Sequence, residues 1–488
     1  MNGAGTQEHR NRVHFARLAP LCAAALALGI TARAFGAAGT HPAASPTSVL
    51  QAAGDEVRAY NHDYPWLHYS GIASHNDIAH LIEAMASGKV KLQFRKPRGY
   101  LDSLLKALKI SPTSQALVFS KTSLQTRIIG PATPRAIYFN DDTYVAWIRN
   151  SPDVEINTMD SSLGPVFYTL DEQPVPRPHF IRQTLVCLAC HDSFSLQGGG
   201  VPQFLFLSAY QVANDKVITD ASAIETTNAT PFDRRWGGWY VTGKLGRMLD
   251  LGNLTTTSTQ PLPMAKISRA DVPNLDSWFD TKPYLTNKSD VVAVMVLESQ
   301  IDVHNLVIHA SYKSRAILER QIPGGSTKRL TWQQLPAPLQ KRFRALLEPL
   351  VRGMLYVGAA KLPTAVHGTS GYAAWFQALG PFDAHHRSLR DLDLKTRIFK
   401  YRLSYLIYSR AFAFLMPSVK DYLYQRLIQI LTRHDTTGAY AGIPASERKA
   451  ILEILTATKP DFARVYERSK RFGLPDLAPV EAQDPAPS

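Results

Sequence analysis

The sequence predicts an α+β fold that is mainly helical, in which a small antiparallel sheet precedes a long helical region. Two observations predict this class. Short apolar runs bounded by turn-forming residues recur between residues 116 and 170, and this pattern is typical of strands. From residue 290 onward, apolar residues instead recur every three or four positions, which indicates amphipathic helices.

The segment 59–175 is predicted to form an N-terminal α+β domain. Its first elements are two helices, which the apolar spacing predicts over 78–86 and 100–108. Asn140-Asp141-Asp142 has the composition of a hairpin turn between two strands. Short connections favour antiparallel pairing, so we expect a meander. Its predicted strands cover 116–119, 136–139, 144–148, 154–156 and 166–170.

The segment 289–476 is predicted to form a C-terminal helical domain. Its first helix, within 289–317, carries an apolar stripe in which Leu297, Ile301, His304 and Ile308 follow one another at spacings of three or four. The tail, 477–488, is rich in proline and acidic residues and is predicted to be disordered. Further helices are predicted over 331–350, 395–415, 418–432 and 445–456.

Residues 1–34 have the composition of a secretory signal peptide. A basic start is followed by an apolar run, 18–30, that is too short to span a bilayer, and then by the small-x-small pattern Ala32-Arg33-Ala34. Residues 35–58 are predicted to be a linker. We therefore expect export to the periplasm, and a mature chain without a transmembrane anchor.

The stretch Cys187-Leu188-Ala189-Cys190-His191 has the attachment pattern of a c-type haem. Two thiols add to the two vinyl groups of the porphyrin, and the histidine that follows becomes the proximal iron ligand. The sequence has three cysteines, and Cys22 lies in the predicted leader. We therefore interpret 176–288 as a central haem c segment that holds one covalently attached haem per chain.

Other uses of a Cys-x-x-Cys pair are a zinc half-site, a redox dithiol and a structural disulfide. Structural zinc takes four ligands, and the chain has no second cysteine pair. The flanks do not resemble a thioredoxin fold. The dithiol and the disulfide remain as alternatives to haem.

The sixth position of the iron decides between an electron carrier and a catalyst. A carrier usually has methionine or histidine there, whereas a catalyst leaves the position open. Met248 follows His191 by 57 residues, a spacing comparable to that in small cytochromes. His304 is the other candidate, since a histidine on an apolar stripe needs a partner. His179 ranks below both.

Several other residues have a functional and a structural interpretation. Glu298 lies on the same predicted helix as His304, where the two could move protons in a peroxidase-like step. An arginine could bind a haem propionate through its planar fork, and the candidates are Arg182, Arg234 and Arg235. The last two belong to the stretch ATPFDRRWGGWYVTG, which is otherwise expected to be a packed aromatic turn.

Three classes of function lack support in the sequence. A second Cys-x-x-Cys-His motif is absent, which excludes the two-haem scheme of bacterial dihaem peroxidases. No Gly-x-Ser-x-Gly elbow of a hydrolase is present. The formal charge of +14 falls to +11 without residues 1–34, yet the basic residues are scattered and form no nucleic-acid motif. The pair His385-His386 is expected to lie in a surface loop.

At the Cys-x-x-Cys-His motif the chain resembles c-type cytochromes. More broadly, it resembles a family of exported bacterial proteins that contain a cytochrome c domain. The resemblance implies haem c and a place outside the cytoplasm, with Cys187 and Cys190 as thioether attachment sites and His191 as proximal ligand. The blocks that carry it are AIYFNDDTYVAW (136–147), the haem segment into GGGVP, ATPFDRRWGGWYVTG, VAVMVLESQIDVHNL and LRDLDLKTRIFKYRLSYLIYS.

Together these patterns predict a periplasmic mono-haem c protein that transfers single electrons to or from a partner protein. One alternative is a haem c oxidoreductase, peroxidase- or oxygenase-like, with an open distal site. Another is a haem-based sensor or a binding module. We expect no nucleic-acid partner, and the sequence leaves the oligomeric state open.

Overall fold

The computed structural model describes residues 67–192, 200–209, 224–255, 271–321, 330–435 and 437–473, together with Leu477. The predicted signal peptide, the linker and most of the predicted tail lie outside these residues. Within them the chain combines helices with an antiparallel sheet, so the α+β class is confirmed.

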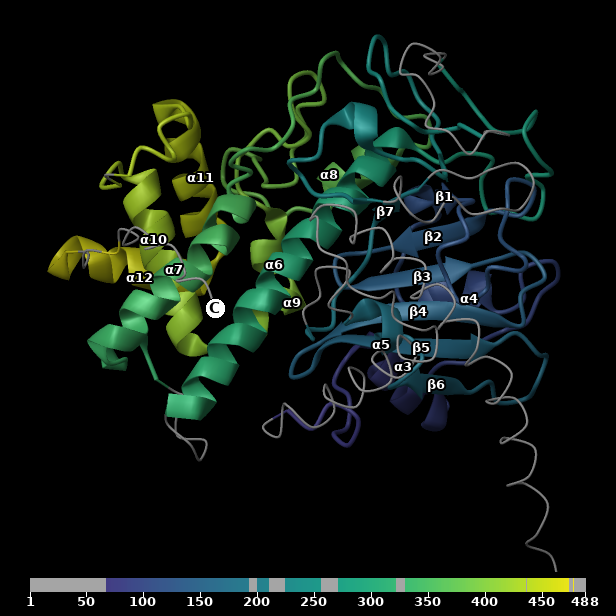
Figure 1. The fold of residues 1–488 in the computed structure, drawn as a ribbon, viewed down its shortest axis with the longest axis horizontal. Helices are drawn as coiled ribbons and strands as arrows, with labels where there is room; N and C mark the ends of the chain where they lie inside the picture. Colours follow the sequence, from purple (N-terminus) through teal and green to yellow (C-terminus); the bar gives the residue numbers. More distant parts are fainter. Residues whose placement is uncertain are drawn as a thin grey trace, which may run out of the picture.

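A seven-stranded antiparallel sheet forms one side of the fold (Figure 1), with the strand order β6-β5-β4-β3-β2-β1-β9. The five predicted strands are confirmed. The hairpin turn at Asn140 is confirmed as well, because the Asn140 side chain accepts the N–H of Thr143 at 2.9 Å. The strands are β1 (Ala116–Val118), β2 (Arg135–Phe139), β3 (Thr143–Trp147), β4 (Asp153–Asp160), β5 (Gly164–Asp171), β6 (Phe180–Gln183) and β9 (Trp239–Tyr240).

The two edge strands were not predicted. β6 follows a proline-rich passage, and β9 is two residues long within the aromatic turn of the central segment. Strands this short carry too little alternation to be recognised without their partners. The sheet therefore takes strands from both 59–175 and 176–288. A further pair, β7 (Leu207–Ser208) and β8 (Ile224–Glu225), forms a separate two-stranded sheet.

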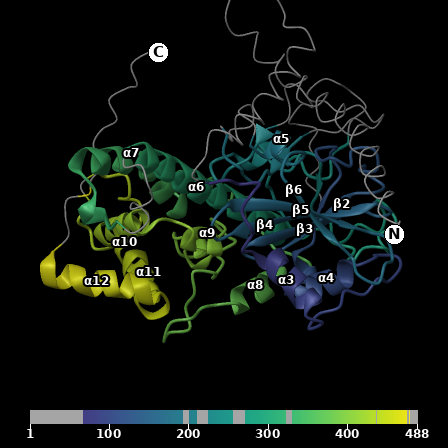
Figure 2. The same ribbon diagram turned by 90° about the horizontal axis from the view of Figure 1, so that it is seen from below.

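One face of the large sheet is covered by α3 (Asp77–Ala86) and α4 (Leu101–Ala107), which confirms both predicted N-terminal helices. Figure 2 shows these two helices on one side of the sheet and the one-turn α5 (Leu188–His191) on the other. Asn76 caps α3 by accepting the Ala79 N–H at 2.9 Å. The same side chain donates to the Tyr168 hydroxyl at 3.1 Å, which ties the helix to β5.

The long helix α6 (Val291–Gln321) crosses the molecule beside the sheet and confirms the helix predicted within 289–317 (Figure 1). Asp290 orders its start, because one carboxylate oxygen accepts the Val292 N–H at 2.8 Å and the other accepts two backbone N–H groups at 369 and 370. By length and composition α6 alone among the described helices could cross a membrane. However, 83% of its most apolar stretch is buried inside the protein.

Most of the remaining helices lie on the far side of α6 from the sheet (Figure 1). The predictions over 331–350, 418–432 and 445–456 are confirmed, the first with a shifted start. Helices α8 and α12 were not predicted. The group consists of α7 (Ala337–Met354), α10 (Pro417–Leu431), α11 (Ala445–Thr458) and α12 (Pro460–Phe472), whereas α8 (Tyr372–Ala378) packs nearer the sheet.

The predicted helix over 395–415 is wrong. The segment contains only a 3-10 turn at Tyr405–Tyr408 and the short α9 (Arg410–Ala413). The Asp393 carboxylate accepts the N–H groups of Lys395 and Thr396, and Leu394 has a positive φ of 56°. Leu392 and Phe399 form an antiparallel bridge, and the Lys400 N–H donates to the Asp391 carbonyl at 2.8 Å. The chain turns back on itself here, so the apolar spacing was not sufficient.

A buried ion pair joins α6 to the aromatic turn 229–243. Arg235 donates to the Glu298 carboxylate at 2.8 Å, and both side chains are essentially inaccessible to solvent. The other guanidinium nitrogens donate to the carbonyls of Thr230 and Asn228. The arginine therefore has a structural role here, as expected for a packed turn.

We predict that Glu298→Ala destabilises the protein strongly, because it leaves the Arg235 charge buried without its partner. Loss of one partner of a buried pair costs about 3–5 kcal/mol. The exposed pair Arg149–Asp280 is the matched control, and Asp280→Ala is expected to cost less than about 1 kcal/mol. Urea unfolding of the two variants measures the difference, and similar costs would contradict the prediction.

Candidate functional site

The Cys-x-x-Cys-His motif forms one helical turn. Cys187 is the N-cap residue of α5, and its carbonyl accepts the N–H groups of Cys190 at 3.2 Å and of His191 at 3.0 Å. Residues at i, i+3 and i+4 share one side of a helix. The turn therefore places both thiols and the imidazole on one side, while Leu188 is fully buried. The thiols are half-buried and are not joined by a disulfide.

The His191 ring is held in a defined tautomer. Its Nδ1 lies 2.8 Å from the backbone carbonyl oxygen of Gln203, and since a carbonyl only accepts, Nδ1 carries the proton. The lone pair is then on Nε2. Burial lowers the pKa of His191 to about 4, so the ring is neutral at pH 7. A metal-binding histidine typically has this arrangement, with its other N–H donated to a carbonyl.

The sheet face beside His191 is only partly covered. The His191 ring packs on Phe167 of β5, with ring centroids 4.5 Å apart. Directly paired residues on the same face run across four strands and are all half-buried: Ile137, Ala146, Glu155 and Thr169. On the opposite face the corresponding core residues are fully buried. The two thiols and the imidazole of the turn are the groups that attach and ligate haem c, so the residues present fit haem in donor chemistry.

Arg135 is a charged residue near His191 that the sequence reasoning missed. Its positive charge contributes to the lowered pKa of His191. The guanidinium pairs with Glu155 at 3.2 Å, and its buried Nε has no hydrogen-bond partner among the described residues. Alternation along the predicted strand 136–139, extended by one residue, would have placed Arg135 on the same face as Ile137.

The arginines named as propionate candidates are placed differently. Arg235 forms its ion pair with Glu298 in the core. Arg182 donates to the backbone carbonyls of Ile72 and Tyr69, which ties β6 to the residues before α3. Arg234 is exposed on the aromatic turn.

His304 lies in the protein core at the end of a chain of hydrogen bonds. Its Nδ1 is 2.8 Å from the Tyr144 hydroxyl, which accepts a bond from Gln300 at 2.8 Å and so directs its own proton to His304. Nε2 then carries the ring proton, and it has no partner among the described residues. Burial lowers the pKa of His304 to about 3. Coordination of iron through Nε2 would require the opposite tautomer.

The other predicted ligands are spread over the protein. Met248 is buried. Four residues before it, Lys244 forms an isolated backbone bridge with His367. His179 is exposed before β6. The pair His385-His386 is exposed in a loop, as predicted. In the described part of the chain, no cluster of three or more His, Cys, Asp or Glu side chains could hold a metal ion.

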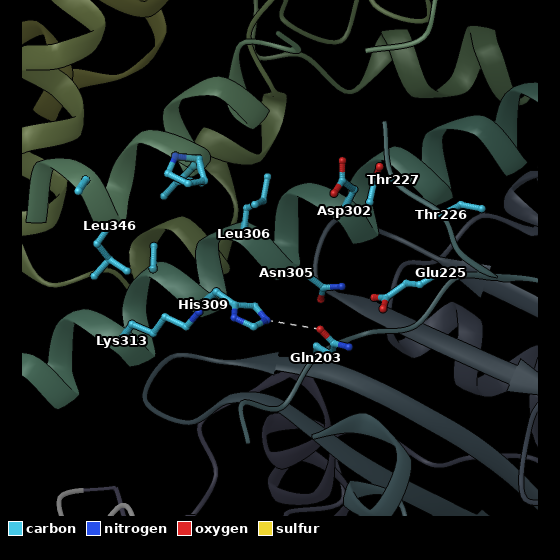
Figure 3. A pocket seen from close by; sticks show the side chains of 14 residues that line it. Gln203, Glu225, Thr226, Thr227, Asp302, Asn305, Leu306, His309, Lys313 and Leu346 are labelled. Atoms are coloured by element: carbon cyan, nitrogen blue, oxygen red, sulfur yellow. Dashed lines mark hydrogen bonds between the residues drawn. The ribbon is translucent and has the colours of Figure 1, made fainter. Parts of the chain in front are cut away.

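A cavity of about 480 Å³ lies next to the motif, between α6, α7 and the segment that carries Gln203 (Figure 3). The Gln203 side chain lines it and lies 3.4 Å from Nε2 of His309. Gln203 therefore contacts His191 through its backbone and the cavity through its side chain.

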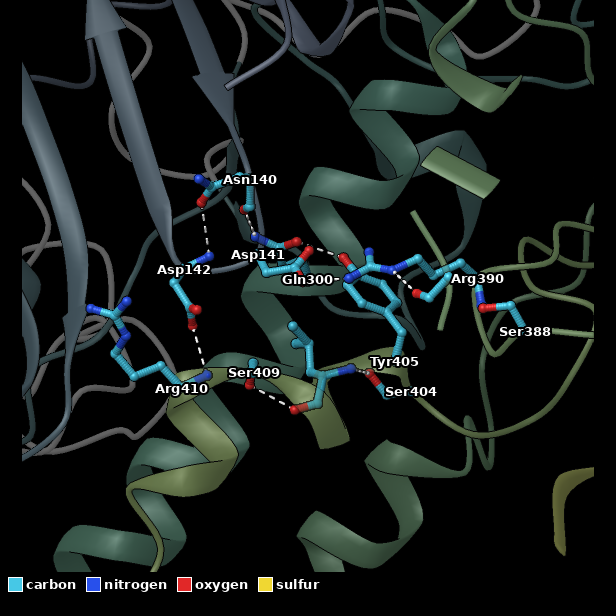
Figure 4. A network of polar contacts seen from close by, with 12 residues as sticks. Asn140, Asp141, Asp142, Gln300, Ser388, Arg390, Ser404, Tyr405, Ser409 and Arg410 are labelled. Carbon is cyan, nitrogen blue, oxygen red and sulfur yellow. Dashed lines mark hydrogen bonds and ion pairs between the residues drawn. The ribbon is translucent and has the colours of Figure 1, made fainter. Parts of the chain in front are cut away.

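A polar cluster joins the β2–β3 turn to α6 and to the segment 388–410 (Figure 4). Arg390 pairs with Asp141 and lies over the Tyr405 ring, and the Tyr405 hydroxyl donates to Gln300 at 2.5 Å. Asp142 accepts the Arg410 N–H at 3.0 Å. The cluster therefore joins segments that lie far apart in the sequence.

Comparisons of the chain with family models, with curated proteins and with solved structures found no match.

The polar cluster makes stability depend on pH. Burial and the neighbouring Asp141 raise the pKa of Asp142 to about 7, from an ordinary value near 3.8. The folded protein therefore binds this proton more tightly than the unfolded chain does. The resulting stability is present in full below pH 4 and is lost as the pH rises through 7.

We predict that Asp142→Asn removes this loss, because the amide oxygen still accepts the Arg410 N–H without a charge. Relative to wild type, the variant should gain on the order of 1–3 kcal/mol between pH 5 and pH 8. Urea unfolding at the two pH values measures the gain. The control is Asp280→Asn, at a half-exposed site, and an equal gain in both variants would contradict the assignment.

Proposed function

We propose that this chain is a periplasmic mono-haem c protein that transfers single electrons. Haem would be attached through Cys187 and Cys190, with His191 as the proximal ligand. The observation that carries the proposal is the Nδ1–carbonyl bond of His191, which leaves Nε2 as the nitrogen with the lone pair on the turn that presents both thiols. Neither a dithiol nor a disulfide needs a histidine held in this tautomer.

The chain's own residues would orient and cover the group. The Gln203 carbonyl fixes the rotation of the His191 ring, and the Phe167 ring supports one side of it. The half-buried row on the sheet would contact the flat face of the macrocycle. Arg135 is the nearby cation suited to a propionate. When bound, haem c supplies an iron that changes reversibly by one electron.

The surroundings of the motif also favour contact with a redox partner. Leu185, just before the motif, is 55% exposed, and Ile181 on the edge strand β6 is 53% exposed. The net positive charge favours an acidic partner. The predicted signal peptide, residues 1–34, would direct the chain to the periplasm, where such a partner would be met.

A second candidate function is a haem c oxidoreductase with an open distal site. The cavity lined by Gln203 favours it as a place for an organic substrate beside the motif, because a simple carrier has no need for a pocket of about 480 Å³. The same preparation distinguishes the two functions.

We predict one covalent haem per chain when the protein is made with haem c maturation machinery. A pyridine haemochrome spectrum and the intact mass should show two thioether bonds. Cys187→Ala and Cys190→Ala should each leave one such bond, and the double variant should carry no covalent haem. Cys22→Ala is the control and should change nothing. A colourless wild-type protein with the mass of bare polypeptide would overturn the proposal.

We predict a low-spin ferric spectrum, as expected for a carrier. Carbon monoxide should leave the spectrum of the ferrous form unshifted. High-spin iron with a ready carbon monoxide adduct would instead favour the oxidoreductase.

We expect His304→Ala to leave the spin state unchanged, because the His304 lone pair faces Tyr144. It should still destabilise the protein by about 1–3 kcal/mol, since the buried partner group loses its bond. Met248→Ala is the paired variant, and a spin change there would assign the sixth position to Met248. Conversion of His304→Ala to high spin would show that His304 is the ligand.

A further inference from the structure

We propose that the cavity between α6, α7 and β8 binds a small organic amine, with its ammonium group on the acidic wall and its apolar body on α7. This inference goes beyond electron transfer and holds whether or not haem is attached. It rests on the shape of the cavity, on the division of its lining into apolar and acidic walls, and on one buried carboxylate oxygen.

The size and the lining suit a small molecule. Cavities of several hundred Å³ with mostly apolar walls and a few polar groups are typical ligand sites, and this one measures about 480 Å³. Every lining residue that α7 contributes is apolar. They are Ala345, Leu346, Pro349 and Leu350, and Leu306 and Ala310 of α6 extend the same wall.

The opposite wall is acidic. Glu225 of β8 and Asp302 of α6 both line the cavity, and their labelled carboxylates lie on the same side of it in Figure 3. One oxygen of Asp302 is occupied, because Asn228 donates to it through its backbone N–H at 2.9 Å and its side chain at 2.7 Å. Asp302 is therefore fixed in place.

Glu225 provides the unsatisfied group. Its Oε2 is buried and has no hydrogen-bond partner among the described residues. A buried oxygen left in this state is unfavourable, because it has lost its bonds to water and gained none in the protein. An ammonium group would supply both the missing donor and the missing positive charge.

The other titratable groups of the lining do not supply that charge. Burial lowers the pKa of His309 to about 4, so it is neutral at pH 7, and its Nε2 faces Gln203. Lys313 lines the cavity but is exposed. An anion would have to approach two carboxylates. A metal ion would find too few ligands, since no described cluster has three.

The test is calorimetric titration of the full chain with three probes of one shape at pH 8. They are 2-phenylethylamine, 2-phenylethanol and 3-phenylpropionate, which are cationic, neutral and anionic. We expect the amine to bind at least about tenfold more tightly than the alcohol, and the acid not to bind measurably. Equal binding of the three, or preference for the acid, would overturn the proposal.

The pH dependence identifies the carboxylate. Burial and the charge of Asp302 raise the pKa of Glu225 to about 7. The amine stays charged from pH 6 to pH 8, while Glu225 loses its proton. The affinity of the protein for the amine should therefore rise about tenfold over this range. Asp302 also has a raised pKa, whereas His309 stays neutral over this range.

Glu225→Gln should weaken amine binding about tenfold at pH 8 and abolish its dependence on pH. Glu83→Gln, on the exposed face of α3, makes the same change in net charge and should alter neither. Ala345→Trp, at an exposed position in the lining, should block all probes without disturbing the core. Unchanged amine binding in both Glu225→Gln and Ala345→Trp would place the ligand elsewhere and refute the inference.

Discussion

The fold depends on the burial of polar side chains along α6. Polar side chains on a helix in the middle of a protein favour partners from other segments, because an unpaired buried group is costly. Polar residues along α6 bind different segments of the chain. Glu298 holds the aromatic turn through Arg235, Gln300 holds the β2–β3 turn, Asp302 holds Asn228, and Asn305 pairs with the backbone of Phe204.

This arrangement links the haem motif to the rest of the core. Asn305 fixes the backbone at Phe204, and the preceding residue, Gln203, presents its carbonyl to His191. The same Gln203 side chain enters the cavity beside His309. The short segment at Gln203 and Phe204, held by one residue of α6, therefore sets both the ring orientation of the candidate iron ligand and one wall of the candidate amine site.

The local elements were largely predictable, and the failures have physical causes. Strong alternation or helical spacing identified β1 to β5, α3, α4, α6, α10 and α11. The two-residue β9 exists because β1 offers it a partner, and no local pattern announces such a strand. The predicted helix at 395–415 fails at its start because the chain forms a tight turn there, closed by the antiparallel bridge between Leu392 and Phe399. Apolar spacing takes no account of that turn.

The candidate site divides in the same way. The motif itself, with Cys187, Cys190 and His191, was readable because covalent attachment requires those residue types at that spacing. The surroundings were not readable, because Arg135, Gln203 and Glu225 are ordinary residues whose meaning depends on what lies opposite them. His304 attracted attention as a histidine on an apolar stripe, whereas its tautomer depends on Tyr144, which lies 160 residues away in the sequence.

Thus the sequence alone determined the α+β class, most of the longer helices, the central strands and the chemistry expected at the motif. All of these follow from spacings of a few residues along the chain. The tertiary structure alone decided which nitrogen of His191 holds the lone pair, which arginine lies near it, and that Glu225 and Asp302 face an apolar wall. Those features depend on contacts between distant segments, and the burial of α6 brings those segments together.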